Sequence, residues 1–375
     1  MNHRPQPRHV LVTGATGFVG SAIVAELLAR HDDTIVTCLV REKAGTDPTE
    51  RLHRHLGKTL ADHDQIGLTS RLAERVGVLV GDVTDVNLAT TAEQLDQPVD
   101  EVWHAAASLR YRDKDADEIR AHNVDGTRHV LALAAAAGAT SFNHVSTAYV
   151  AGRRSGLIVE GPVPEGTEWN NQYERSKIDG EALVAASGLH HRIFRPSIVI
   201  GHSGTMLAES DAGVYGFLRE MQRFVSAVGD PSALPALNIA AHVDTGLNLI
   251  PVDLVASSAV AIAASDSDAH YFHLTNGHTA LVRDAIPMVC EVLGLPAPNF
   301  IDDVESLSPE DKLVNKLLDF YLPYLGGERI FDRSNADAVV DDRLDHLIDP
   351  PEQRRIVVTY LDSVTEIPET TAAHA

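Results

Sequence analysis

Short apolar, β-branched runs alternate with amphipathic stretches through the first half of the chain. Runs of this kind, bounded by turn residues, are typical of strands. The predicted strands are 10–13, 35–40, 76–80, 99–104, 142–146 and 191–195. Helical periodicity lies between them at 20–30, 119–137 and 176–186. Because strands and helices alternate, we expect an α/β fold of the Rossmann type, built on a doubly wound parallel sheet.

The pattern changes after Pro196, where Gly-rich and Pro-rich connections begin. The later predicted elements are a strand and a helix within 247–264, a strand at 271–276 and a helix at 282–293. In the first of these helices, Pro251 and Asp253 both suit the first turn. Two amphipathic stretches follow, at 312–325 and 336–347.

These patterns predict two parts. A Rossmann dinucleotide-binding domain covers 1–202 and is completed by a segment near 245–265. A smaller, mainly helical substrate lobe covers 203–375. The polar stretch 41–75 is interpreted as an inserted, exposed helix and loop without an assigned role.

Composition narrows the function classes. The 44% hydrophobic and 22% charged residues are typical of a folded globular protein. No apolar run approaches the ~20 residues of a membrane-spanning helix, and no signal peptide is recognised. With 31 basic and 53 acidic residues, the net charge of −22 argues against nucleic-acid and membrane-surface binding. Two cysteines, Cys38 and Cys290, fit a reducing compartment, and we expect a cytoplasmic protein.

A glycine-rich loop joins the first predicted strand to the first helix. Its glycines are Gly14, Gly17 and Gly20. Gly14 permits the tight turn, Gly17 lets the backbone approach a pyrophosphate, and Gly20 lets helix and strand pack closely. The helix start offers unpaired N–H groups to the anion. The loop therefore predicts a dinucleotide site, to which we also assign Thr16, Phe18 and Val19.

Residues at the ends of the second, third and fourth predicted strands indicate which dinucleotide binds and how. Arg41 occupies the place where an acidic residue usually meets the ribose of NAD, so the sequence favours NADP(H). The alternative is a solvated Arg41 with Glu42 turned inward. Asp82 can accept from the adenine amino group while Val83 packs on the ring, or Asp82 can simply cap its loop. The small residues at the fourth strand end, which would let the dinucleotide cross the sheet edge, are Ala105, Ala106 and Ala107.

Tyr173 and Lys177 lie four positions apart, hence on one face of a helix. An ammonium beside a phenol favours the phenolate, so we expect a lowered Tyr173 pKa and proton transfer at a carbonyl oxygen. Ser146 and Thr147 lie at the carboxyl end of the fifth strand, where a hydroxyl can bond the same oxygen. Taken alone, a Tyr–Lys pair at this spacing is more often a surface contact.

Together these motifs resemble the extended short-chain dehydrogenase/reductase superfamily. The resemblance implies that Tyr173 is the general acid/base, that Lys177 also holds the nicotinamide ribose, and that Thr147 orients the substrate carbonyl. A narrower resemblance, to fatty acyl-CoA reductases and terminal thioester-reductase domains, rests on five segments: 104–107, 123–127, 145–150, 194–201 and 250–253.

The narrower resemblance implies a reaction and further site residues. In that branch NADPH reduces a CoA-bound or carrier-bound acyl thioester to an aldehyde, sometimes onward to an alcohol. The substrate would come from free CoA or from an acyl or peptidyl carrier protein. Asn123 would stabilise the active-site loop or a relay water. Pro196, Ser197 and Ile198 would border the nicotinamide carboxamide.

Other functions stay open at this point. An extended dehydrogenase or epimerase acting on a nucleotide sugar or a hydroxysteroid is the second hypothesis, although Arg41 opposes it. A catalytically silent cofactor-binding protein is the third. We expect no catalytic metal, because the histidine pairs lack a third ligand at a suitable spacing. The apolar residues that could line an acyl channel, or form the lobe's own core, are Val214, Phe217, Leu218, Phe224, Phe320 and Tyr321.

Overall fold

The computed structural model describes residues 9–30, 32–210, 212–228, 230–301, 307–308, 311–312, 315–316, 318 and 321–365. Within them a seven-stranded parallel sheet runs in the order β12-β7-β5-β4-β1-β2-β3. Its strands are β1 His9–Thr13, β2 Ile35–Val40, β3 Val76–Val80, β4 Glu101–His104, β5 Ser141–Val145, β7 His190–Pro196 and β12 Tyr271–Leu274. This confirms the predicted Rossmann-type sheet.

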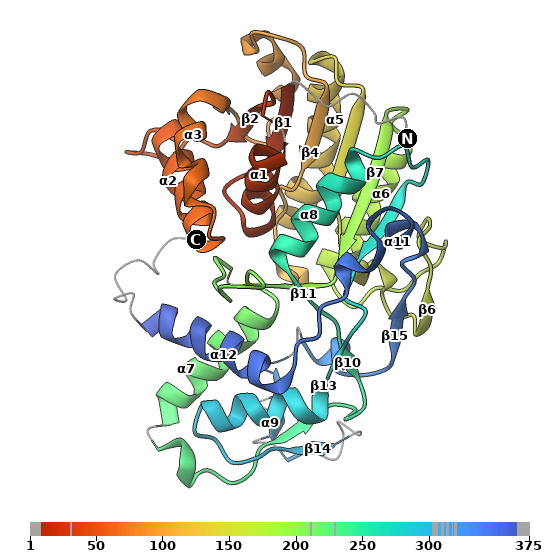
Figure 1. Cartoon of the computed structure of the whole chain (residues 1–375). Coiled ribbons are helices and arrows are strands. Elements are labelled where there is room, and N and C mark those ends of the chain that lie inside the picture. Colours follow the sequence, from red (N-terminus) through yellow and green to blue (C-terminus); the bar gives the residue numbers. More distant parts are fainter. Residues whose placement is uncertain are drawn as a thin grey trace.

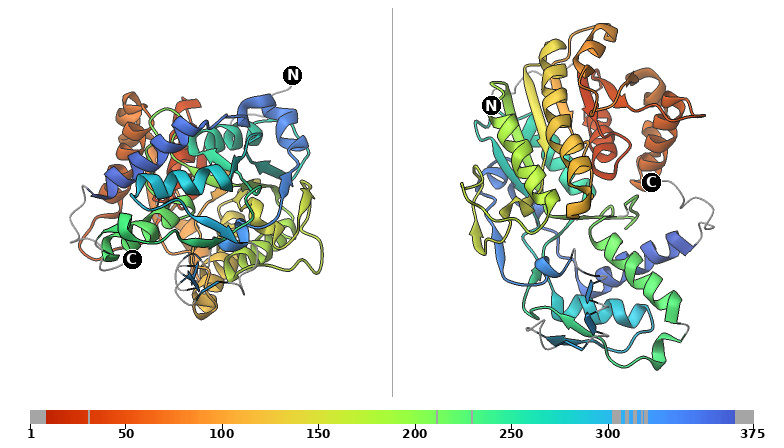
Figure 2. Two further views of the ribbon diagram at one scale, coloured as in Figure 1. Left: turned by 90° about the horizontal axis from the view of Figure 1, so that it is seen from below. Right: turned by 180° about the vertical axis from the view of Figure 1, so that it is seen from behind.

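Helices cover both faces of the sheet, as Figures 1 and 2 show. Helices α1 (Phe18–Arg30) and α8 (Val252–Ala263) pack together on one face. Helices α5 (Gly126–Ala136) and α6 (Gln172–Ala185) lie on the other. The side chains of β1 alternate accordingly, because Val10 and Val12 belong to the first core and Leu11 to the second.

The helix predicted over 119–137 is three pieces. Helix α4 (Ala116–Arg120) runs into a π-helical turn, Ala121–Asp125, before α5 begins. The wider turn places the buried Asn123 side chain against the backbone of Ser108. Turns of this kind occur frequently at functional sites.

The stretch interpreted as an exposed insertion is the connection between β2 and β3. It consists of α2 (Pro48–Asp62), the 3₁₀ turn Ile66–Leu68 and α3 (Thr69–Arg75). The prediction is wrong for α2, since its buried leucines at positions 52, 56 and 60 pack into the main core. Their spacing of four is the signature of an amphipathic helix, which the polar composition of the stretch concealed.

Two elements after residue 245 complete the domain. Strand β11 (Leu249–Pro251) pairs with β8 (Ile198–Ile200), and α8 follows it directly. Pro251 ends this strand and caps α8, so its predicted place in the first helical turn is wrong. Strand β12 then joins the edge of the main sheet beside β7, outside the range that the sequence assigned to this domain. The two domain boundaries themselves stay predictions.

The later chain forms a smaller, mainly helical lobe beside the carboxyl ends of the sheet strands (Figure 1). Its helices are α7 Val214–Val228, α9 Val282–Val292 and α12 Pro350–Thr365. Its short strand pairs are β9 Asn238–Ala240 with β14 Asn299–Ile301, and β10 Gly246–Leu247 with β13 Ala280–Leu281. The lobe has an apolar core of its own.

Two late segments return to the first domain. Helix α11 (Ser334–Val340) packs on α8 and β12, and β15 (Arg329–Phe331) pairs with β6 (Gly156–Ile158). The amphipathic stretch predicted over 336–347 is therefore α11 followed by the 3₁₀ turn Asp341–Leu344. The stretch predicted over 312–325 falls partly outside the described residues.

Candidate active site

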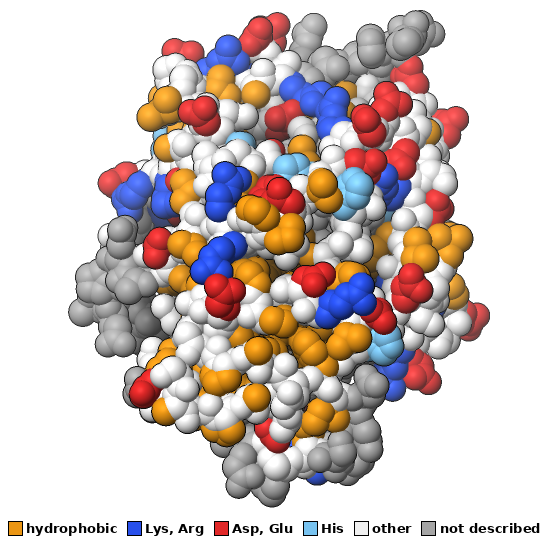
Figure 3. Space-filling view, turned by 60° about the horizontal axis from the view of Figure 1, so that its bottom comes forward, with side chains coloured by type: hydrophobic (Ala, Val, Ile, Leu, Met, Phe, Trp, Pro, Cys, Tyr) orange, Lys and Arg blue, Asp and Glu red, His pale blue; other side chains and the backbone are white. Residues whose placement is uncertain are grey.

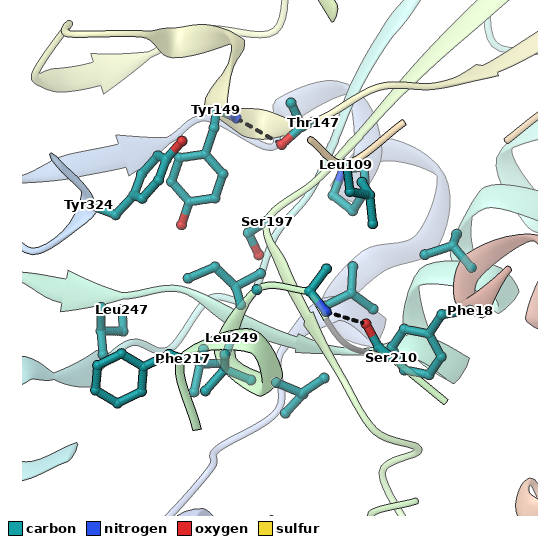
Figure 4. Close-up of a pocket in the computed structure, with 18 of the residues that line it drawn as sticks. Phe18, Leu109, Thr147, Tyr149, Ser197, Ser210, Phe217, Leu247, Leu249 and Tyr324 are labelled. Carbon is teal, nitrogen blue, oxygen red and sulfur yellow. Dashed lines mark hydrogen bonds between the residues drawn. The ribbon is translucent and has the colours of Figure 1, made fainter. Parts of the chain in front are cut away.

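A cavity of about 480 Å³ lies between the sheet's carboxyl edge and the lobe (Figure 4). Seen obliquely from the lobe's end, hydrophobic side chains gather across the middle of the molecule (Figure 3). Most of the predicted site residues line this cavity: Gly14, Gly17, Phe18, Val19, Gly20, Ala105, Ala107, Thr147, Tyr173, Lys177, Pro196, Ser197 and Ile198. The structure therefore brings the glycine loop and the Thr–Tyr–Lys set to one place.

The glycine loop has the geometry that its sequence predicts. Gly14 has a φ of +75°, and a Cβ there would lie 2.6 Å from the backbone of Ala105. A Cβ at Gly20 would lie 2.1 Å from the Gly14 carbonyl oxygen, so α1 packs on this turn only because position 20 is glycine. At Gly17 the nearest atom would be 3.3 Å away, and the residue is exposed. The open side of Gly17 and the start of α1 fit a dinucleotide pyrophosphate.

Tyr173 and Lys177 lie one turn apart on α6, with the Lys177 Nζ 5.9 Å from the centre of the phenol ring. Lys177 donates to the Val145 carbonyl oxygen at 2.9 Å, which fixes its ammonium at the end of β5. Burial lowers the pKa of Lys177 to about 8, while Glu181 acts in the opposite direction. Two ammonium hydrogens remain for a ligand.

The expected lowering of the Tyr173 pKa is wrong for this structure. Burial raises the pKa of the phenol above its ordinary value, and the neighbouring Glu174 carboxylate raises it further. Tyr173 is therefore a neutral phenol at working pH. A neutral phenol can donate a proton, which is what a carbonyl under reduction requires.

Ser146 and Thr147 directly follow β5 at the cavity wall. The Thr147 Oγ accepts from the Tyr149 backbone N–H at 3.2 Å, which leaves its hydroxyl hydrogen for the cavity (Figure 4). The Ser146 Oγ is buried and has no hydrogen-bond partner among the described residues. A buried hydroxyl without a protein partner at a cavity wall fits a bound ligand.

Asn123 lies behind this set rather than in the cavity lining. Its amide donates to the Ser108 carbonyl oxygen at 3.0 Å and to the Ser176 Oγ at 2.9 Å, and its Oδ1 accepts from the Ser108 N–H at 2.7 Å. The Ser176 hydroxyl in turn donates to the Tyr173 carbonyl oxygen at 2.7 Å. Asn123 therefore ties the loop after β4 to the turn that carries Tyr173.

The segment after β7 is held by buried polar contacts. Arg195 forms a two-point ion pair with Glu181, with distances of 2.9 and 2.7 Å, and both side chains are buried. The Ser197 Oγ donates to Asn248 at 2.6 Å. These contacts fix the backbone that leads Pro196 and Ser197 past the cavity.

The other predicted cofactor-binding residues lie outside the lining of this cavity: Thr16, Arg41, Asp82, Val83 and Ala106. Arg41 follows β2 with 65% of its side chain exposed, and its Nη1 lies 3.9 Å from the Asp82 Oδ2. The other Asp82 oxygen accepts from the Thr84 N–H and hydroxyl at 2.8 Å, so Asp82 also caps its loop. The Arg51 guanidinium donates to the Arg41 carbonyl oxygen, which places a second cation against the backbone at the end of β2.

The lobe supplies an apolar wall. Three of the residues predicted for an acyl channel, Val214, Phe217 and Tyr321, line the cavity. Leu218 is buried in the lobe core and Phe224 packs against it. Phe320 lies outside the described residues. Further apolar residues of the lobe that line the cavity include Ala212, Leu247, Ala285, Ile286, Met288, Val289, Leu325, Ile356 and Val357.

Sequence reasoning missed a polar group beside Tyr173. Glu174 is fully buried and accepts from the Tyr324 hydroxyl at 2.7 Å. Tyr324 also packs edge-on against Tyr149, with ring centres 4.8 Å apart. Both tyrosines line the cavity (Figure 4). Tyr149 belongs to a motif that the sequence singled out, but nothing in the sequence pointed to Tyr324.

Two searches of the described residues bear on other functions. No group of three or more His, Cys, Asp or Glu residues is placed there to hold a metal ion. No described helix has the length and apolar character needed to cross a membrane.

Comparisons with known proteins identify the family. The family described as "Male sterility protein" matches residues 12–259, more than half of the chain. Fatty acyl-CoA reductase 1 of Xenopus laevis is 30% identical over 307 residues, which cover 69% of this chain and 55% of that protein. The chain spans about half the length, or less, of the curated relatives that it matches first.

Solved structures share the fold. The terminal R domain from the myxalamid PKS-NRPS biosynthetic pathway superposes with a TM-score of 0.73 at 24% identity, covering 96% of this chain and 92% of that domain. UDP-glucuronic acid 4-epimerase from Bacillus cereus, in complex with NAD, gives 0.64 at 18% identity, covering 97% and 99%. These matches support a nicotinamide dinucleotide as the cofactor. The chain belongs to the Male sterility protein family, within the extended short-chain dehydrogenase/reductase superfamily.

Proposed function

We propose that this protein uses NADPH to reduce an acyl thioester to an aldehyde. One observation carries the proposal: Thr147, Tyr173 and Lys177 share a cavity with the glycine loop, and the lobe closes that cavity with apolar side chains. The loop suits the dinucleotide, and the hydroxyls suit a carbonyl oxygen. The apolar wall suits an acyl chain.

The residues of this chain divide the work as follows. Bound NADPH supplies the hydride, which forms the new C–H bond at the thioester carbon. The Thr147 hydroxyl and the Tyr173 phenol donate hydrogen bonds to the oxygen on which negative charge develops, and Tyr173 gives it the proton. Lys177 binds the cofactor ribose and helps to return a proton to the Tyr173 phenol after each transfer. The C–S bond then breaks as the new hydroxyl gives up its proton, the departing sulfur takes up that proton, and aldehyde and thiol leave in equal amounts.

The choice of NADPH over NADH rests on Arg41. Arg41 follows β2, and the Arg51 guanidinium donates to its backbone carbonyl oxygen, at the strand end where the second ribose of the dinucleotide binds in Rossmann folds. Guanidinium suits a 2′-phosphate, whereas a free ribose hydroxyl suits a carboxylate. The Asp82 carboxylate nearby also meets Arg41, so the preference is expected to be moderate.

The acyl donor is a CoA thioester or an acyl or peptidyl carrier protein. Fatty acyl-CoA reductases stand among the relatives, and a thiolation-reductase di-domain of an archaeal non-ribosomal peptide synthetase stands among the similar structures. Each additional methylene group buried against this wall contributes ~0.8 kcal/mol to binding, so the wall favours acyl chains long enough to reach it. Placement in a reducing compartment stays a prediction from the two buried cysteines.

The second candidate is reduction or epimerisation of a nucleotide sugar, because the epimerase structures share the fold. The apolar lining of the lobe side disfavours it, since a sugar diphosphate needs polar partners. NADPH oxidation at 340 nm tests both candidates across acyl-CoAs, acyl-carrier proteins, aldehydes and nucleotide sugars. We expect oxidation with the thioesters. Oxidation with nucleotide sugars alone would replace the first proposal by the second.

A further inference from the structure

A closed ring of hydrogen bonds surrounds the start of α6. The Asn171 Oδ1 caps the helix by accepting from the Glu174 N–H at 3.0 Å. The Asn171 amide donates to the Tyr324 Oη at 2.9 Å, and that hydroxyl donates to the Glu174 Oε1 at 2.7 Å. Two of the three members come from the helix start, and the third lies 150 positions further along the chain.

The Glu174 carboxylate is satisfied by neutral donors. Besides Tyr324, the Asn170 backbone N–H donates to it at 2.7 Å and the Asn170 amide at 3.1 and 3.2 Å. Among the described residues, no Lys or Arg forms an ion pair with it. A fully buried carboxylate held this way loses much when one donor is removed, because the charge stays buried.

This ring encloses the residue on which the proposed chemistry depends. Tyr173 lies between Asn171 and Glu174, in the first turn of the helix. Helix ends fray unless their backbone groups are satisfied. Tyr324 also packs against Tyr149, whose backbone N–H fixes the Thr147 hydroxyl. The Tyr324 side chain therefore contacts a residue beside each of the two hydroxyls. It contacts Glu174 next to Tyr173, and Tyr149, whose backbone N–H bonds Thr147.

We infer that Tyr324 and Glu174 are positioning residues, which clamp the first turn of α6 and hold the Tyr173 phenol in place for proton donation. The inference rests on the proposed function for its kinetic consequences. The clamp itself is a structural claim and can be measured without a substrate.

The charge of Glu174 gives the clamp a second effect. It raises the pKa of the Tyr173 phenol beyond the effect of burial. The ionisable groups around this phenol are Glu174 and Lys177 on its own helix, with Tyr149 and Tyr324 packed beyond Glu174. Removing the carboxylate charge is therefore expected to lower the Tyr173 pKa, whereas removing the Tyr324 hydroxyl leaves that charge in place.

The test compares Tyr324→Phe and Glu174→Gln with a control, Tyr360→Phe. The control also removes a buried hydroxyl, one without a partner among the described residues and away from the cavity lining. The first readout is hydrogen exchange of a peptide covering 170–180. We expect exchange to speed up by about tenfold in Tyr324→Phe and to stay unchanged in Tyr360→Phe.

The second readout is the pH profile of thioester reduction. Tyr324→Phe should lower kcat by about tenfold with little change in KM or in cofactor affinity. Glu174→Gln should also move the alkaline limb of kcat that the phenol sets, which lies above that of Lys177, to lower pH, because the phenol loses its proton earlier. A purely structural role would lower kcat in both variants without moving that limb.

The outcomes distinguish the clamp at α6 from the proposed thioester reduction. Exchange, kcat and pH profile of both variants matching the unmutated protein would overturn the inference. Faster exchange without any kinetic change would also overturn it, because the clamp would not serve Tyr173. If the unmutated protein reduces no thioester, the proposed function fails, and unchanged exchange in Tyr324→Phe would then reject the clamp independently.

Discussion

Tyr173 combines a position in the first turn of α6 with an environment that keeps its phenol protonated. Replacing it by phenylalanine removes the proton donor and little volume. We expect Tyr173→Phe to lower reductive turnover by roughly 10² to 10⁴. Cofactor affinity, measured by fluorescence titration, should stay close to that of the unmutated protein. Near-normal turnover would show that water or Ser146 supplies the proton.

Lys177 serves as the comparison, because it is expected to bind the cofactor as well as to support the proton. Lys177→Ala should therefore weaken both turnover and cofactor affinity. Equal losses of affinity in the two variants would contradict this division of roles.

Arg41 is exposed, so solvent screens its contact with a 2′-phosphate. We expect the unmutated protein to bind NADPH about tenfold more tightly than NADH, and Arg41→Ala to remove most of that preference. Arg354, an exposed arginine paired with Glu291 on the lobe, gives a matched control. Equal dissociation constants for both cofactors in the unmutated protein would exclude the assignment.

In the glycine loop, we expect Gly20 to be needed for folding and Gly17 for cofactor binding. A Cβ at Gly20 would lie 2.1 Å from the Gly14 carbonyl oxygen, whereas one at Gly17 would lie 3.3 Å from it, a tight contact that a shift of a few tenths of an ångström relieves. We expect Gly20→Ala to lower the melting temperature strongly, because the strand and helix must move apart. Gly17→Ala should melt normally and bind NADPH at least about tenfold more weakly. Equal melting temperatures in both variants would contradict this reading.

The elements also show what a sequence can predict. The six early strands and the Tyr173–Lys177 spacing follow from local periodicity, and the structure has them. The ring at Glu174 does not follow, because its third member lies 150 positions away and no local pattern marks a pairing at that distance. The Tyr173 pKa was misjudged for a related reason, since burial depends on the packing of the whole site.

At the scale of the whole molecule, buried neutral histidines set the acid response. Burial and the Lys177 ammonium lower the pKa of His104 to about 3, and that of His144 well below its ordinary value. The Thr127 hydroxyl already donates to a carbonyl, so His104 is the donor to Thr127 and accepts from Thr13. Protonation would reverse the bond to Thr13, because the Nδ1 would then donate and the Thr13 hydroxyl would have to accept.

The unfolded chain binds these protons near pH 6.5 and the folded chain much lower, so stability falls as the pH drops below 6.5. The loss is about 1.4 kcal/mol per pH unit for each such histidine. Burial raises the pKa of Glu160 to about 7, so this carboxyl changes stability in the opposite direction. It is one group against the two histidines. Urea unfolding should therefore give a smaller free energy at pH 5 than at pH 7. Equal values at both pH would contradict the neutral assignment.

The Rossmann domain and the lobe together form the cavity in which we expect an acyl thioester to be reduced to an aldehyde. Counting free thiol with a disulfide reagent during NADPH oxidation tests it most directly. The account predicts one thiol released for each NADPH consumed while the aldehyde is the product, and loss of both signals together in Tyr173→Phe. NADPH consumption with ketones or nucleotide sugars, and never with matching thiol release, would contradict it.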